Sequence, residues 1–240
     1  HQEARRQRQM CIRDSDWIVS FDINSLYPHI IIQYNISPEK IVGESSHGIN
    51  VNKMLDMKVP LNYLKTEGAC LTPNGAKFKN DSQGFLPEMM EKMYNERVVF
   101  KKRMIKAKQQ YERTKNPKLV KEIARCHNIQ WSKKIALNSA YGAVGNQYFR
   151  YYDVRQASGI TTAGQFIIRL IENKMNEYLN KVLQTHGKVD YIVASDTDSI
   201  YVTLDKLVEK TCKDKTKEQK IDFLDKVCLL YTSDAADELL

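Results

Sequence analysis

Short apolar stretches rich in β-branched residues alternate along the chain with longer stretches that have helical spacing. Strands are predicted at residues 16–23, 189–194 and 200–204, each bounded by polar or turn residues. A helix is predicted at 162–184, where the apolar positions form one continuous stripe, and further helices are predicted at 26–34, 88–114 and 118–141.

Breaks between these stretches indicate how the elements connect. Asn116-Pro117 separates two long helices, which are therefore expected to run antiparallel as a hairpin. Residues 41–85 contain repeated glycine and proline and are expected to be an irregular connection. The order strand, helices, helix, strand pair predicts an α+β fold: an antiparallel sheet backed by helices, with an inserted antiparallel helical hairpin.

Positive charge is concentrated in that hairpin. The whole chain has 37 Lys and Arg against 29 Asp and Glu, a formal net charge of +8. Residues 91–134 have fourteen Lys or Arg and four Asp or Glu, so 14 − 4 = +10, and the remainder is slightly acidic. A local basic patch fits a polyanionic partner better than an even distribution would.

Composition excludes several other classes of protein. No stretch approaches the roughly 20 apolar residues of a membrane-spanning helix, so a soluble, cytoplasmic protein is expected. The five cysteines have neither Cys-x-x-Cys nor zinc spacing, which indicates reduced thiols rather than a disulfide framework.

Two acidic clusters lie at the ends of predicted strands. Asp22 ends the first strand, whereas Asp196 and Asp198 lie at the tip of the last strand pair. Phosphoryl transfer to a nucleotide uses two divalent ions about 3.5–4 Å apart, and Mg²⁺ prefers carboxylate oxygens. Asp22 and Asp198 are the main candidate ligands.

The hairpin supplies candidate phosphate-binding residues. Arg97 and Lys101 are four residues apart, as are Lys134 and Asn138, so each pair shares one helix face. A triphosphate needs positively charged partners of this kind.

Three motifs resemble those of one family. The segments Asp22-Ile-Asn-Ser-Leu-Tyr-Pro, Lys134-Ile-Ala-Leu-Asn-Ser-Ala-Tyr-Gly and Asp196-Thr-Asp-Ser resemble motifs A, B and C of the family B DNA polymerases, with flanking sequence most similar to the replicative enzymes of large tailed phages. The resemblance covers residues 16–210. Ala194-Ser195 replaces the family's usual Tyr-Gly, and His29 replaces a common Ser.

The resemblance implies an activity and a set of site residues. The activity is template-directed DNA synthesis from deoxynucleoside triphosphates with two Mg²⁺ ions, for which Mn²⁺ can substitute. Primer–template DNA is the implied partner, and a sliding clamp would contact regions outside this chain. The implied metal ligands are Asp22, the carbonyl of Ile23, Asp198 and, less directly, Asp196. The implied nucleotide-binding residues are Ser25, Leu26, Tyr27, Arg97, Lys101, Lys134 and Asn138, with Tyr141 and Gly142 against the DNA.

The resemblance also implies a division of the chain. Residues 16–84 and 143–226 would form two parts of a palm, with 85–142 as the fingers, whereas 1–15 and 227–240 are expected to be non-native or disordered tails. The exonuclease region and the thumb of the family are not in this sequence, so the chain is expected to be a palm-and-fingers fragment.

Other interpretations stay open from the residues alone. The aspartates also suit polar turns, the lysines solvated helix faces, Tyr27 a core position, Gly142 a helix C-cap and His29 an ordinary helix face. At the level of function, the alternatives are a nucleic-acid-binding fragment without catalysis and a polymerase that uses or makes RNA.

Overall fold

The computed structural model describes residues 15–59, 67–187 and 189–237, so residues 1–14 of the predicted N-terminal tail (1–15) and 238–240 of the predicted C-terminal tail (227–240) lie outside it. The chain divides into two compact units. Among the described residues, one unit contains those up to Asp22 together with those from Glu172 onward, and the other contains those within Ile23–Ile171.

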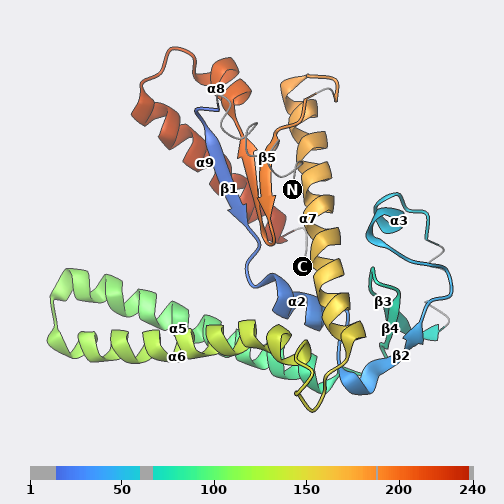
Figure 1. Ribbon diagram of the computed structural model, residues 1–240. Helices are drawn as coiled ribbons and strands as arrows, with labels where there is room; N and C mark the ends of the chain where they lie inside the picture. Colours follow the sequence, from blue (N-terminus) through green and yellow to red (C-terminus); the bar gives the residue numbers. More distant parts are fainter. Residues whose placement is uncertain (1–14, 60–66, 188, 238–240) are drawn as a thin grey trace. The chain divides into compact units, whose positions relative to one another are not determined.

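The first unit is built on a three-stranded antiparallel sheet (Figure 1). Its strands are β1 (Ile18–Asp22), β5 (Ile192–Asp196) and β6 (Ser199–Thr203), in the order β1-β6-β5. Ile200 and Val202 of the central strand are buried. The three predicted strands are confirmed, although β5 begins at Ile192 rather than at 189.

Helices accompany this sheet within the same unit. They are the C-terminal part of α7 (Val154–Leu183), α8 (Asp205–Cys212) and α9 (Lys217–Asp237). Two side chains of α7 hold the chain that leads into β5: Asn176 Oδ1 accepts from Tyr191 N at 2.8 Å, and Asn180 Nδ2 donates to the Val189 carbonyl at 2.7 Å. The hairpin β5–β6 is therefore fixed to α7 at its base.

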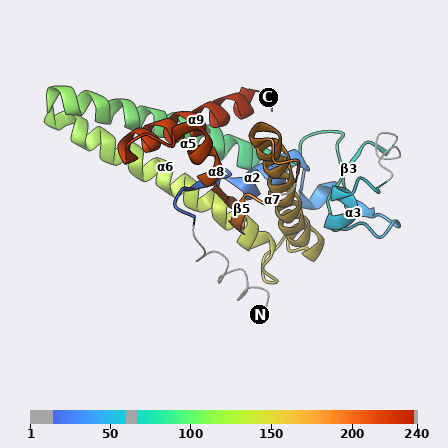
Figure 2. The ribbon, with the colours of Figure 1, turned by 90° about the horizontal axis from the view of Figure 1, so that it is seen from above.

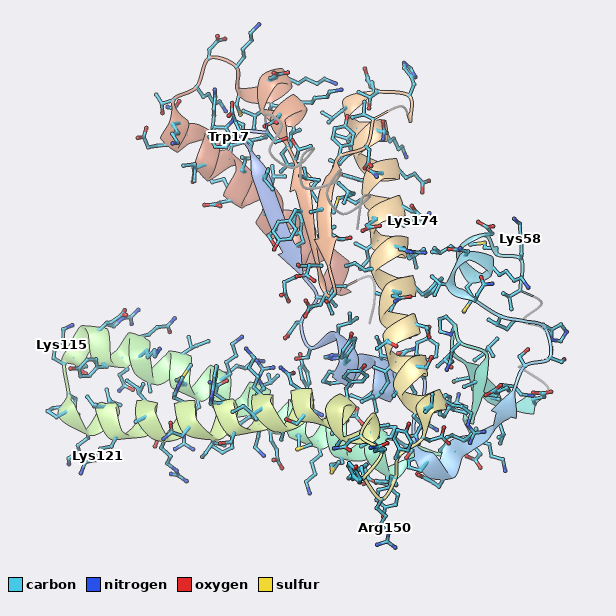
Figure 3. All side chains as sticks on the ribbon, viewed as in Figure 1. Trp17, Lys58, Lys115, Lys121, Arg150 and Lys174 are labelled. Carbon is cyan, nitrogen blue, oxygen red and sulfur yellow. The ribbon has the colours of Figure 1, made fainter. Side chains whose placement is uncertain are left out.

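The second unit contains the helical hairpin of α5 (Phe85–Thr114) and α6 (Pro117–Val144), which lie side by side in both ribbon views (Figures 1 and 2). Lys115, at the turn in Figure 3, has the left-handed φ of 53° that ends α5. Asn116 then caps α6 by accepting from Lys118 N at 3.0 Å. The predicted hairpin is confirmed.

Residues from outside α5 hold its first turn. Its N-cap is Gly84, whose amide donates to Asn35 Oδ1 at 2.8 Å, and the next amide, Phe85 N, donates to Glu39 Oε1 at 2.8 Å. Leu86 N donates to Ser37 Oγ at 3.3 Å. These partners satisfy amides that have no acceptor inside a helix, and they fix the direction in which α5 begins within the unit.

The expectation of an irregular connection at 41–85 was wrong. A second antiparallel sheet lies there, with β2 (Ile41–Glu44), β3 (Ala69–Leu71) and β4 (Ala76–Lys79) in the order β2-β4-β3. It is accompanied by η1 (Pro38–Lys40) and α3 (Val51–Leu55). Strands of three or four residues are too short to show a clear alternation. β3 and β4 form a local hairpin, but β2 pairs with β4 across residues 45–75 of the sequence.

The core of the second unit forms around α2 (Leu26–Gln33). Ile30 and Ile31 of α2 are fully buried and pack with Met90 of α5 and Leu137 of α6. The N-terminal part of α7 joins this core, since α7 begins at Val154, eight residues before the predicted start. Within the described ranges, no helix is long and apolar enough to cross a membrane.

Candidate active site

The two predicted acidic clusters meet at one edge of the first sheet. Asp22 is paired with Ser199 across β1 and β6, and Asp196 is paired with the same Ser199 across β5 and β6. Directly opposed residues project from the same face, and neighbouring strands are about 4.8 Å apart, so the two aspartates flank Ser199 on one face with about 10 Å between their backbones. Asp198 lies in the turn beside Ser199, after Thr197 with its left-handed φ of 48°.

This acidic edge suits a divalent cation only in part. Asp22 and Asp196 are exposed and Asp198 is half-buried, and none of the three forms an ion pair with a described lysine or arginine. In the described part of the chain, no three His, Cys, Asp or Glu side chains gather closely enough to hold a metal. Mg²⁺ needs only one or two carboxylates when substrate phosphates and waters complete its octahedron, so the donor set fits such an ion.

In the second unit, Arg97 of α5 contacts the turn that precedes α2. Its Nη1 donates to Ser25 Oγ at 3.1 Å, and its Nε is buried without a hydrogen-bond partner. The side chain lines a cavity of about 320 Å³ together with Asn24, Tyr94, Lys101 and other residues of α5. Arg97 and Lys101, which the sequence predicted as a pair, therefore line the same cavity.

The second predicted pair lies elsewhere on the hairpin. Lys134 Nζ lies 5.2 Å from the centre of the Trp131 ring, a cation–π contact, and Asn138 is exposed one turn further on. Neither residue lines the cavity at Arg97. The neighbouring Lys133 forms an ion pair with Glu96 across the hairpin, and its hydrogen bond lowers the pKa of that carboxyl.

Two tyrosines from motifs distant in sequence meet in this unit. The ring centres of Tyr27 in α2 and Tyr141 in α6 are 4.9 Å apart. Behind Tyr27 lies Gly164 of α7, where an added Cβ would be 3.2 Å from the tyrosine Cε1. Gly142 lies inside α6, whose C-cap is Gly145, so the alternative reading of Gly142 as a C-cap was wrong. An added Cβ at Gly142 would meet no atom within 4 Å, which leaves an open surface beside Tyr141.

Sequence reasoning missed two residues of the Arg97 surface. Asn24 Nδ2 donates to the Tyr94 hydroxyl at 3.2 Å, and both residues line the cavity. The three-residue spacing of Tyr94 and Arg97 on one helix was a usable signal for the tyrosine. No local pattern indicated the contact of Asn24, because its partner is 70 residues away.

Carboxylates that can hold divalent ions, together with basic side chains that can bind phosphates, are what phosphoryl and nucleotidyl transfer requires. The family model for DNA polymerase family B matches residues 15–220, and the chain belongs to this family.

Its relatives include the DNA-directed DNA polymerases of Escherichia phage RB69, at 34% identity over 88% of this chain, and of Enterobacteria phage T4, at 35% over 85%. The chain spans 28% and 27% of their respective lengths. The fold is similar to the structure of the family B DNA polymerase from the archaeon Pyrobaculum calidifontis, with a TM-score of 0.51 and 23% identity over 84% of this chain and 23% of that one.

Proposed function

We propose that the chain takes part in template-directed DNA synthesis, in which a primer 3′-hydroxyl attacks the α-phosphate of a deoxynucleoside triphosphate and pyrophosphate leaves. The observation that carries this proposal is the pairing of Asp22 and Asp196 with one residue, Ser199, beside the turn of Asp198. Membership of DNA polymerase family B supports the same chemistry. In this proposal the sheet edge belongs to a palm and the α5–α6 hairpin forms the fingers.

The aspartates would hold two divalent ions, which activate the attacking hydroxyl and stabilise the leaving pyrophosphate. Asp22 and Asp198 would be the main ligands, the carbonyl of Ile23 would add an oxygen donor, and Asp196 is a further candidate ligand. Their carboxylates are free of ion pairs with the described basic side chains, so no such pair must break before a cation binds.

The basic residues of the hairpin would bind the triphosphate. Arg97 has a buried Nε without a partner at the wall of a cavity, and the exposed Lys101 follows it on the same helix. Lys134 would leave the Trp131 ring for a phosphate, because a charge-assisted hydrogen bond of about 1.5–3 kcal/mol exceeds an exposed cation–π contact of about 0.5–1 kcal/mol. Asn138 would support the same phosphates.

The residues around α2 would bind the sugar and the base pair. Ser25 and Leu26 precede Tyr27, whose ring would lie against C2′ of the incoming sugar and exclude a ribose hydroxyl. Packing against Tyr141 on one side and Gly164 behind it supports a fixed ring position. Tyr141 and the open surface at Gly142 would then lie under the nascent base pair.

Primer extension by the 240-residue chain with Mg²⁺ tests the proposal. Asp22→Asn and Asp198→Asn are each expected to reduce single-turnover nucleotide transfer by several orders of magnitude while DNA binding persists. Asp214→Asn is the matched control, because Asp214 is exposed between α8 and α9 in the same unit and belongs to none of the three strands. Near-normal transfer by Asp198→Asn would refute the metal assignment. Wild-type binding of DNA without extension would support the non-catalytic alternative.

A further inference from the structure

A closed set of contacts surrounds Ser25, the residue to which Arg97 donates. Ser25 has φ 55° and ψ 46°, a left-handed conformation that costs a residue with a side chain free energy and persists only where neighbours hold it. Because this turn carries the hydroxyl that contacts Arg97, whatever holds Ser25 also fixes the position of the guanidinium.

His29 holds the backbone of Ser25. Its Nδ1 lies 2.9 Å from the Ser25 carbonyl oxygen. A carbonyl oxygen only accepts hydrogen bonds, so Nδ1 must carry a proton, and neutral His29 is the Nδ1–H tautomer. The same carbonyl accepts the first helical bond of α2 from His29 N at 3.2 Å, so one residue binds it twice.

Asn24 and Tyr94 hold the side chain of Ser25. The Ser25 hydroxyl has one proton, which it donates to Asn24 Oδ1 at 3.2 Å, because the guanidinium of Arg97 cannot accept it. The other half of the amide, Asn24 Nδ2, donates to the Tyr94 hydroxyl at 3.2 Å. The Tyr94 ring in turn packs against His29, with ring centres 4.6 Å apart at 79°. Because His29 contacts the Ser25 carbonyl, the contacts of Ser25, Asn24, Tyr94 and His29 form a closed ring.

We infer that His29, Asn24 and Tyr94 are positioning residues that hold Ser25, and through it Arg97, in the geometry that binds a triphosphate. This inference rests on the proposed function. A guanidinium already held by Ser25 loses less conformational freedom when it binds a phosphate than a freely rotating one does. One Nη1–H is used by Ser25 and Nε is buried, so the second Nη1–H and the two Nη2–H groups are the donors left for a phosphate.

The first test measures the Kd of deoxyadenosine triphosphate for the 240-residue chain, with Mg²⁺ and without primer. Tyr94→Phe removes only the oxygen that accepts from Asn24, and it is expected to weaken binding about two- to tenfold. Tyr111→Phe is the matched control, because it makes the same change on α5 beyond the residues that line the cavity, and it is expected to leave the Kd unchanged.

A double variant distinguishes a positioning role of Tyr94 from a general loss of structure. Because Tyr94 acts through Arg97, adding Tyr94→Phe to Arg97→Ala is expected to weaken binding no further than Arg97→Ala alone. Equal effects of Tyr94→Phe and Tyr111→Phe would overturn the inference, and so would a double variant whose loss equals the product of the two single losses.

A second test needs no nucleotide and so separates failure of the inference from failure of the proposed function. The ¹⁵N resonances of His29, assigned by comparison with His29→Gln, are expected at about pH 8.5 to show a protonated Nδ1 and a bare Nε2. The Nε2–H tautomer would overturn the inference even if the chain binds triphosphate. If the chain binds no triphosphate, the proposed function fails for this chain. The tautomer of His29 then decides by itself whether His29 holds Ser25 as inferred.

Discussion

Replacing Asn35 with alanine is expected to destabilise the second unit, because this one buried side chain joins three segments. Its Nδ2 donates to the carbonyls of Lys79 at 2.7 Å and Ser82 at 2.9 Å, and its Oδ1 accepts from Gly84 N at 2.8 Å. These three hydrogen bonds, at about 0.5–1.5 kcal/mol each, give about 1.5–4.5 kcal/mol. Asn35 also has a left-handed φ of 53°, which asparagine tolerates better than alanine does.

A central value of about 3 kcal/mol corresponds to a fall in Tm of about 6–12 °C for a chain of this size. Thermal unfolding followed by circular dichroism measures it, with Asn128→Ala on the exposed face of α6 as the control. Asn35→Gly is expected to lose the same hydrogen bonds without the backbone strain, and so to be less destabilised than Asn35→Ala. If Asn35→Ala and Asn128→Ala melt at the same temperature, the three bonds do not stabilise the unit as argued.

Three further perturbations test separate parts of the structure. Tyr27→Ala is expected to raise the kcat/KM of ribonucleotide relative to deoxynucleotide in primer extension while deoxynucleotide addition persists, and an unchanged ratio would make Tyr27 only a packing residue. Gly84→Ala would place a Cβ 2.6 Å from Ser37 Cβ, so a loss of about 1–3 kcal/mol is expected in thermal unfolding, and an unchanged Tm would contradict the fit. Hydrogen bonds from Arg155 lower the pKa of Asp153, so their stabilisation is present above the unfolded-state pKa of about 3.9 and is lost as pH falls through the lower folded value. Arg155→Ala is therefore expected to be less stable than wild type at pH 7, with a difference that shrinks below about pH 4; a constant difference across that range would refute the linkage.

The main elements were predictable because their signals are local. Asp22 follows a strand-like apolar run, and the break at Asn116-Pro117 lies between two long helical stretches, so both the sheet edge and the hairpin follow from short windows of sequence. The second sheet was not predictable in this way. Phe78 is fully buried in the four-residue strand β4, whose hairpin with β3 is local, but nothing near it in sequence identifies β2 as its other partner.

The residues of the candidate site also differ in whether a local sequence pattern predicted them. The spacing of Arg97 and Lys101 placed both residues on one surface of α5, and the structure agrees. Asn24 and His29 acquire their contacts from the left-handed turn at Ser25, and a serine in that conformation has no sequence signature. The roles of Asp22, Asp196 and Asp198 as metal ligands stay predictions. Strand pairing places Asp22 and Asp196 across from Ser199, but this placement does not test cation binding.

The buried thiol of Cys126 provides a chemical probe of whether the α5–α6 hairpin opens. It lies in α6 with 1% of its surface exposed, and burial together with the hydrogen-bonded Glu122 carboxylate raises its pKa. Since only an accessible thiolate reacts with an alkylating reagent, the closed hairpin protects this sulfur both sterically and chemically. The rate at which iodoacetamide modifies Cys126 therefore reports how readily α5 separates from α6. A ligand that holds the two helices together would lower this rate.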